Sequence, residues 1–283
     1  MVKMTFLVDN KTGEPCIGAE HGLSIYIEAL GKKILFDAGA TRTLFSDNAK
    51  RLGVDLSQVD FAAVSHGHYD HTNGFPLFIK QNSRAPIYIH KDSFEKVYGV
   101  EDGVIDQETC SIEWTESERK QLEDRLVLTD GPMWLCEDIV VTGTVPTADG
   151  KAAFGNFLVD KGNGEFVKDD ILHEQLLVIR DRDEMGKSRG LFVFAGCCHR
   201  GAVEAVEYAK ALFPGEEITC FVAGMHLAFC SEEVRTSVIE KIIDLQPKLL
   251  IPVHCTGIDA IIRLKILLGD RCIVATAGDT YEL

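Results

Sequence analysis

The sequence predicts an α/β protein in which two β-sheets lie between outer helices, a four-layer αββα sandwich. Short apolar runs with the character of buried strands recur along the chain, and segments with helical spacing of apolar residues lie between them. The alternation of strands and helices in the first half continues in the second half with new elements. Two sheets covered by helices accommodate this order, with a site expected where loops from both halves meet at one edge.

The elements of each half are predicted from periodicity and from the residues that end each run. In the first half, strands are expected at 4–9, 23–29, 33–37, 61–65 and 87–90, with helices at 43–52 and 74–80. In the second half, strands are expected at 139–142, 157–159, 175–180, 191–195, 218–222, 249–253 and 272–275, with helices at 202–212, 232–245 and 259–268. The segment Gly278 to Thr280 is interpreted as the end of the last strand.

Length and composition favour a single domain over residues 1–283. No linker rich in Pro, Gly or Ser divides the chain, and 46% of its residues are hydrophobic, enough for a sizeable core. No apolar run approaches the ~18 residues that cross a bilayer, and the first ten residues lack the features of a signal peptide. We therefore expect a cytoplasmic protein without a membrane partner.

One stretch, at about 91–125, departs from the strand and helix patterns. It is rich in Asp and Glu and poor in apolar residues, with Trp114 as the exception. We interpret it as a solvated insertion or helical cap, because runs of charge are commonly solvated surfaces. A substrate lid is the alternative, since a large aromatic side chain in a polar stretch needs a surface to pack against.

Charge and cysteine content narrow the range of partners. The formal net charge of −15 disfavours a nucleic acid, because phosphate backbones are bound mainly by clustered Lys and Arg. A small anionic substrate stays compatible, since bound metal ions would reverse the local field. The nine cysteines are odd in number and form no CxxC pair, which indicates reduced thiols, several of them in the core. The oligomeric state is left open.

A cluster of metal-binding residue types follows the expected strand at 61–65. His66, His68, Asp70 and His71 form the pattern HxHxDH within AVSHGHYDHTNG at 63–74. A strand that ends in such a turn brings its last side chains to a sheet edge, where imidazoles and a carboxylate can converge on a metal. These ligands suit zinc, manganese or iron, so the residue types do not select the ion. A histidine-rich surface turn is the alternative.

Three further histidines follow apolar strands of the second half in the same way. His199, His226 and His254 each come shortly after a strand, at 191–195, 218–222 and 249–253. A strand end can deliver a ligand to the sheet edge, and these three are the natural donors to complete the metal site. Any one of them alone would more often be a hydrogen-bonded structural histidine.

These motifs resemble the metallo-β-lactamase superfamily, for which HxHxDH after a strand is specific. The remaining motifs are similar to those of one branch of this superfamily, the dihydropterin-6-methyl-aminobenzene-ribofuranosyl-phosphate synthase-like proteins. These are metal-dependent hydrolases of the β-lactamase type. The resemblance runs from about residue 16 to the C-terminus. It rests on SHGHYDHTNG at 65–74, which contains HxHxDH, and on motifs that are weak one by one and persuasive together: FDAG at 36–39, EHGLS at 20–24, GCCH at 196–199, GMHL at 224–227 and PVHCTG at 252–257.

The resemblance implies a site for one or two divalent ions, with zinc preferred. One ion would be held by His66, His68 and His199, and the other by Asp70, His71 and His254. Asp37 would accept a hydrogen bond from a ligand imidazole and orient it. For His21 no ligand role is expected.

The motif GCCH departs from the superfamily because it has no aspartate to bridge the two ions. The second ion is therefore less well supported than the first. Cys197 or Cys198 could supply a thiolate, although buried core thiols are the commoner use of cysteine.

The expected chemistry is hydrolysis of a small phosphorylated or acyl substrate by a metal-bound hydroxide. Asp70 would orient the water, and His226 would donate to the leaving oxygen or hold a phosphate. The family name implies a narrower reaction, in which a dihydropterin diphosphate loses diphosphate to an aminobenzene ribofuranosyl phosphate. An iron-dependent oxidoreductase of the same fold and a non-catalytic small-molecule binding protein are the alternatives.

Overall fold

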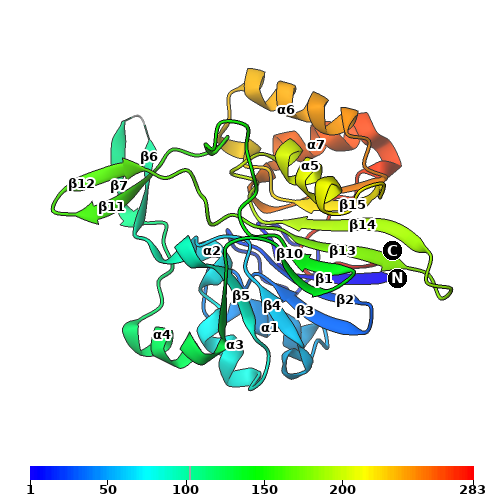
Figure 1. Ribbon diagram of the computed structural model, residues 1–283, viewed down its shortest axis with the longest axis horizontal. Coiled ribbons are helices and arrows are strands. Elements are labelled where there is room, and N and C mark those ends of the chain that lie inside the picture. The colour runs from blue at the N-terminus through cyan, green and yellow to red at the C-terminus, as the bar shows by residue number, and fades with distance from the viewer. Residues whose placement is uncertain (102) are drawn as a thin grey trace.

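Two β-sheets packed face to face form the centre of the computed structural model, which describes residues 1–101 and 103–283 (Figure 1). The first sheet has the strand order β17 (Thr280–Glu282), β1 (Val2–Val8), β2 (Ser24–Ala29), β3 (Lys32–Phe36), β4 (Phe61–Ala63), β5 (Ile87–His90) and β8 (Leu126–Thr129). The second has the order β16 (Leu249–Pro252), β15 (Ile218–Ala223), β14 (Ser188–Ala195), β13 (Leu177–Arg182), β10 (Ile139–Val141) and β9 (Met133–Cys136).

Helices cover the outer face of each sheet. On the side of the first sheet lie α1 (Leu44–Arg51) and α3 (Phe75–Gln81), and on the side of the second lie α5 (Ala202–Leu212), α6 (Glu232–Asp244) and α7 (Ile258–Leu268) (Figure 1). The fold is the predicted four-layer αββα sandwich. Among the described residues, no helix combines the length and the apolar character needed to cross a membrane.

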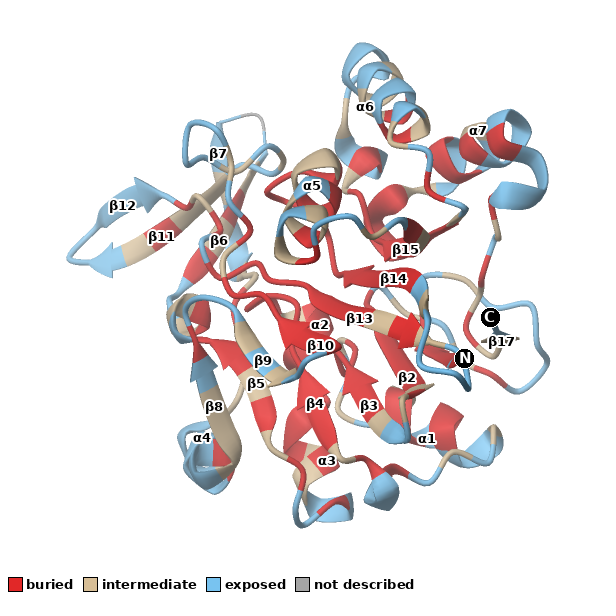
Figure 2. Ribbon diagram, turned by 45° about the vertical axis from the view of Figure 1, so that its right-hand side comes forward, coloured by how far each residue is buried: buried red, intermediate tan, exposed pale blue. Residues whose placement is uncertain are grey.

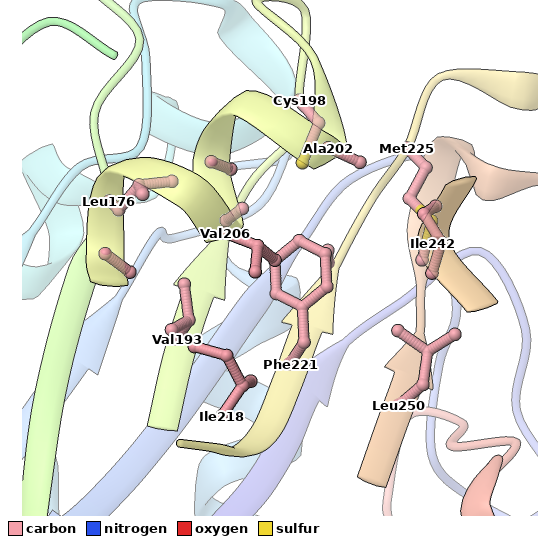
Figure 3. Close-up of a cluster of buried hydrophobic side chains, with 14 of the residues drawn as sticks. Leu176, Val193, Cys198, Ala202, Val206, Ile218, Phe221, Met225, Ile242 and Leu250 are labelled. Atoms are coloured by element: carbon pink, nitrogen blue, oxygen red, sulfur yellow. The ribbon is translucent and has the colours of Figure 1, made fainter. Parts of the chain in front are cut away.

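Three apolar clusters hold these layers together, and Figure 2 shows that the buried residues concentrate along the strands. The first lies between the two sheets and includes Phe36 and Phe194, whose ring centroids are 6.1 Å apart. The second joins α5 and α6 to the second sheet through Val206, Phe221 and Ile242 (Figure 3), and it includes Leu264 of α7. The third packs α1 and α3 against the first sheet.

A small third sheet projects from one side of the sandwich (Figure 1). Its strand order is β12 (Glu165–Lys168), β11 (Phe157–Gly162), β6 (Val97–Glu101) and β7 (Val104–Thr109), all antiparallel. Thus part of the polar stretch at 91–125 pairs with a hairpin from much later in the chain. The sequence patterns assigned no strand to 97–109, because β7 is largely exposed and lacks an apolar alternation.

Trp114 anchors the rest of this stretch to the body. Its indole Nε1 donates to the carbonyl oxygen of Thr72 at 2.9 Å, and its ring packs edge-on against those of Phe75 and Phe94. The short helix α4 (Glu116–Leu122) follows and begins with a capping box at Thr115 and Glu118. The structure thus supplies the packing surface that Trp114 requires.

The predicted strand at 272–275 is wrong. Only Cys272 makes a bridge, to Leu250 of β16, and Thr276 then turns the chain by donating its backbone N–H to Asp279 Oδ2 at 2.8 Å. This turn carries the chain across to β1, where β17 pairs antiparallel. The segment at 278–280 therefore leads into the last strand and does not end one.

Besides β6 and β7, four further strands of the structure, β8, β9, β12 and β17, were not predicted. Each has only three or four residues and at most one buried residue, so the sequence offers too short a pattern to identify it.

We expect the inter-sheet cluster to dominate stability. Phe194→Ala should lower the free energy of unfolding by about 3–5 kcal/mol, because it leaves a cavity among fully buried side chains. Phe166→Ala, at a position of β12 that is 37% exposed, is the matched control and should cost about 1 kcal/mol or less. Urea unfolding measures both. Similar losses in the two variants would contradict this account of the core.

Candidate metal centre

The carboxyl ends of neighbouring parallel strands meet at one edge of the sandwich. In the first sheet β3 and β4 run parallel, and in the second sheet β14, β15 and β16 run parallel. The residues that follow these strands carry the histidines and carboxylates singled out in the sequence. Because parallel strands present their carboxyl ends on the same edge, five separate chain segments deliver side chains to one place.

The first group of ligand atoms belongs to His66, His68 and His199. His66 Nε2 lies 3.1 Å from His68 Nδ1, and the His199 ring centroid is 5.0 Å from each of their rings. One ligand atom each from His66, His199 and Cys197 lie within 4.8 Å of one another. All four side chains are buried.

The second group surrounds the carboxylate of Asp70. Its Oδ2 lies 3.2 Å from His254 Nε2, 3.6 Å from His71 Nε2 and 3.3 Å from Nε2 of His21. His71 and His254 also share a 4.8 Å cluster with Cys197, and His21 shares one with Asp70 and His254. The structure therefore brings together the six residues predicted as ligands, and it adds His21, whose side chain is 46% exposed.

Oxygen acceptors orient three of these imidazoles. His71 Nδ1 lies 2.7 Å from Asp37 Oδ2, His254 Nδ1 lies 2.7 Å from Asn10 Oδ1, and His199 Nδ1 lies 3.3 Å from the carbonyl oxygen of Phe154. Each acceptor holds a proton on Nδ1, which leaves the lone pair of Nε2 directed toward the cluster. The contact with Asp37 is the one expected from the sequence.

These donor atoms fit a divalent cation. His199 Nε2 is buried and has no hydrogen-bond partner, and His254 Nε2 is buried and faces the Asp70 carboxylate at 3.2 Å without forming a hydrogen bond. A lone pair on either nitrogen is costly there unless a cation accepts it. Two nitrogen or oxygen ligands on one tetrahedral zinc would be about 3.3–3.5 Å apart. The separations of 3.1 Å between His66 and His68 and 3.2 Å between Asp70 and His254 are close to this range. A metal role for each residue remains a prediction.

A buried hydrogen-bond network supports the HxHxDH turn. Asp37 Oδ1 accepts from the backbone N–H of Ser65, and Asp37 Oδ2 accepts from the Ser65 hydroxyl, both at 2.7 Å. Ser65 Oγ also lies 2.9 Å from His66 Nδ1. Gly196 permits this contact, because a Cβ there would come within 2.1 Å of Ser65 Oγ. The glycine of GCCH thus lets the two sheets approach closely.

Four of the nine described non-glycine residues with positive φ lie at this edge. Asp37, Cys198, His226 and His254 have φ between 48° and 57°, the left-handed region that non-glycine residues rarely adopt. Each lies at the end of a strand that supplies the cluster. Such conformations cost of order 1–3 kcal/mol each and are retained mainly at functional sites. The strain therefore supports a functional role for this edge.

Burial and neighbouring charges set the protonation of the cluster. Burial lowers the pKa of His68 to about 3 and also lowers the pKa values of His66 and His199 well below their usual range. Burial acts in the same direction on His71, but the Asp70 and Asp37 carboxylates outweigh it and raise the pKa of His71 to about 9. The cluster thus holds neutral imidazoles beside one that a cation would deprotonate.

Three residues of the site were missed or left undecided by the sequence. His173 Nδ1 accepts from the backbone N–H of Gly67 at 3.0 Å, and its ring stacks on His66 at 6.2 Å. His173 precedes β13, whereas the ligands predicted from the sequence all follow strands. Phe157 of β11 brings its ring to 4.8 Å from that of His68. Cys197, undecided from the sequence, belongs to the cluster, and no sequence pattern distinguished it from Cys198.

His226, predicted as a substrate-facing group, lies beside the first group of ligands. Its ring centroid is 4.5 Å from that of His199, and its Nδ1 is buried without a partner. Its backbone N–H donates to Cys255 Sγ at 3.2 Å. The ring of Phe229, which is 71% exposed, lies 5.3 Å away, so His226 neighbours both a predicted ligand and an exposed aromatic side chain. Its catalytic role stays a prediction.

The chain belongs to the metallo-β-lactamase superfamily, whose family model matches residues 17–150. An uncharacterized protein of Methanocaldococcus jannaschii is 30% identical to it over 94% of both chains.

Among named relatives, the chain is similar to the 7,8-dihydropterin-6-methyl-4-(beta-D-ribofuranosyl)-aminobenzene-5'-phosphate synthase of the same organism. The identity is 28% over 86% of this chain and 83% of that protein. A solved structure described as a metal-dependent hydrolase of the beta-lactamase superfamily has a TM-score of 0.79 and 25% identity, and it covers 100% of this chain and 99% of its own. A diphosphatase of the PhnP family, at 13% identity and a TM-score of 0.53 over 100% and 98% of the two chains, shares the fold.

The metal-free protein should lose stability as the pH falls from 7 to 5. The unfolded chain takes up protons on histidine near pH 6.5, whereas folding lowers the pKa of His68 to about 3, so the unfolded state binds more protons in this window. One such imidazole contributes about 2 kcal/mol of destabilisation at pH 5. The contribution of His71, with its pKa raised to about 9, is fully present below pH 6.5 and is lost progressively as the pH rises from there through 9.

Urea unfolding with a chelator present, at pH 5 and pH 7, measures this effect. His68→Gln removes one of the buried imidazoles and should reduce the difference between the two pH values. An unchanged difference in that variant would contradict the assignment of the effect to this cluster.

Asp37→Asn should weaken metal binding about 10- to 100-fold, because an amide has one acceptor oxygen and its NH2 group would face either the Ser65 backbone N–H or His71 Nδ1. Asp47→Asn, at an exposed position of α1, is the matched control and should leave affinity unchanged. Competition with a chelating dye reports both affinities. Equal affinity in the two variants would show that Asp37 does not support a ligand.

Proposed function

We propose that this chain is a metal-dependent hydrolase of a small phosphorylated or acyl substrate. The observation that carries the proposal is the convergence of imidazoles with fixed tautomers and unpartnered, buried Nε2 atoms beside the Asp70 carboxylate. Its membership of the metallo-β-lactamase superfamily adds support. A divalent ion, zinc by preference, would activate water at neutral pH and polarise a substrate oxygen when bound.

We assign two binding groups to these residues. His66, His68 and His199 would hold one ion, while Asp70, His71 and His254 would hold a second. Asp37, Asn10 and the carbonyl oxygen of Phe154 keep the ligand lone pairs directed at the ions without contacting them.

Two side chains would act on the reacting groups. The Asp70 carboxylate, 5% exposed, would accept a hydrogen bond from the attacking water and fix its direction. The His226 imidazole would donate to an oxygen of the substrate, because its unpartnered Nδ1 lies beside the first ligand group. Both roles require only short movements of a proton within hydrogen-bond distance.

Aromatic side chains favour a small substrate with one apolar part. The Phe157 ring lies 4.8 Å from that of His68 and 6.3 Å from that of His226. Together with Phe229, whose ring lies 5.3 Å from that of His226, it would form an apolar wall that excludes water next to the ligands. Since Phe157 belongs to the small sheet, that sheet would help to define the substrate.

A dihydropterin-related synthase reaction is the second candidate, favoured by the similarity to the named synthase over most of both chains. In that reaction, diphosphate leaves a dihydropterin and an aminobenzene ribofuranosyl phosphate takes its place. The same ligand set would stabilise the departing diphosphate. An iron-dependent oxidoreductase and a non-catalytic binding protein are the remaining alternatives.

Turnover by metal-analysed protein tests these proposals. Phosphomonoesters, phosphodiesters, thioesters and lactones form one panel, and a dihydropterin diphosphate with an aminobenzene ribofuranosyl phosphate forms the second assay. We expect turnover in one of them, and loss of metal and activity together in His68→Ala with most of the fold kept. His90→Ala, a buried histidine outside the ligand clusters, is the control and should keep its metal.

The outcomes separate the candidates. Release of diphosphate only when both pterin and aminobenzene substrates are present would favour the synthase. Stoichiometric iron with oxygen consumption would replace the hydrolase by an oxidoreductase. Tight ligand binding without turnover in metal-replete protein would support a binding protein, and unchanged metal content in His68→Ala would refute the ligand assignment.

A further inference from the structure

Cys197 lies where the two groups of ligands meet. Its Sγ is within 4.8 Å of ligand atoms of His66 and His199 on one side, and of His71 and His254 on the other. The distance to His71 Nε2 is 3.3 Å. The side chain is 3% exposed, so the sulfur faces these imidazoles and not solvent.

The neighbouring Cys198 shows that this placement is specific. Cys198 belongs to the apolar cluster that joins α5 to the second sheet, beside Ala202 and Val206 (Figure 3). Cys198 directly follows Cys197 and has a positive φ of 49°. This conformation turns the chain into the loop that carries His199. Of the two adjacent thiols, one therefore serves the core and the other enters the histidine cluster.

The imidazoles around Cys197 are independent evidence that cations bind at this position. His199 Nε2 and His254 Nε2 belong to different groups, and both are buried without a partner. Each shares a 4.8 Å cluster with the Cys197 sulfur. Two cations that satisfied these lone pairs would lie on either side of one sulfur. The motif GCCH has no carboxylate for that position.

We propose that the Cys197 thiolate is a ligand shared by both metal ions of the proposed hydrolase site. This inference rests on the proposed function only in requiring that the site binds metal. A thiolate is a soft ligand, and a shared thiolate makes the site select zinc, cobalt or ferrous iron over magnesium and manganese. On binding, the thiol proton is released to solvent and the sulfur forms one bond to each ion.

Cys255 is a second cysteine near the histidines, and its role must be distinguished from that of Cys197. It accepts the backbone N–H of His226 at 3.2 Å and shares a cluster with Cys197 and His226. Among the described residues, it joins neither cluster that contains His66 or His71. Cys255 therefore packs behind Cys197 and leaves the shared position to it.

Cobalt(II) loaded into the metal-stripped full chain, under anaerobic conditions, tests the assignment, because a thiolate on cobalt gives charge-transfer absorption in the near ultraviolet. We expect this band to grow with both the first and the second equivalent of cobalt. It should be lost in Cys197→Ser and kept in the matched controls Cys198→Ser and Cys255→Ser. Cys197→Asp should bind two equivalents without the band, since a carboxylate can also bridge.

Several results would overturn the proposal. These are a band that persists in Cys197→Ser, a band that grows with only one of the two equivalents, and two bound cobalt ions without a band in the wild-type protein. Circular dichroism shows whether Cys197→Ser is folded. If it is not, the cobalt stoichiometry and the absorption of Cys197→Asp decide the test. A band without turnover of any substrate would refute the hydrolase and leave the sulfur ligand standing. Failure to bind cobalt would refute both.

Discussion

Buried imidazole lone pairs that point at one another are the constraint on which this structure depends. His66, His68 and His199 are buried as neutral rings, and acceptors such as Asn10 hold the proton of His254 on the nitrogen that faces away from the cluster. Imidazoles whose proton is held on the outward nitrogen, as in His199 and His254, cannot satisfy each other's inward lone pairs, because each presents an acceptor where a donor is needed. A cation resolves the conflict, and the rest of the architecture keeps the rings in this arrangement.

The sandwich imposes the arrangement through its parallel strands. β3 and β4 in one sheet, with β14, β15 and β16 in the other, all end at the same edge, and the inter-sheet core fixes the separation of the two sheets. Positive φ angles at Asp37, His226 and His254 turn the side chains inward at those ends. The stability of the core thus offsets local strain at the cluster, as expected where packing over-determines the backbone.

The sequence identified most residues of the cluster, but it missed residues that do not directly follow a strand. HxHxDH and the histidines after strands were accessible because ligand and strand are adjacent in the chain. His173 comes before its strand, and Phe157 lies in a small sheet that combines residues 97–109 with 157–168. Contacts of this kind join segments far apart in the sequence, and no local periodicity encodes them. The turn at Thr276 that redirects the last strand was missed for the same reason.

The sequence by itself determined the αββα class, most of the strands and helices, and the residue types of the site, because those follow from periodicity and from the chemistry of His, Asp and Cys. Only the tertiary structure decided that Cys197 and not Cys198 faces the histidines, that His21 approaches Asp70, and that Asp37 and Asn10 orient two rings. The physical reason is that the direction of a side chain at a strand end depends on the backbone turn that follows. That turn is set by packing between two sheets whose contacts are distant in sequence.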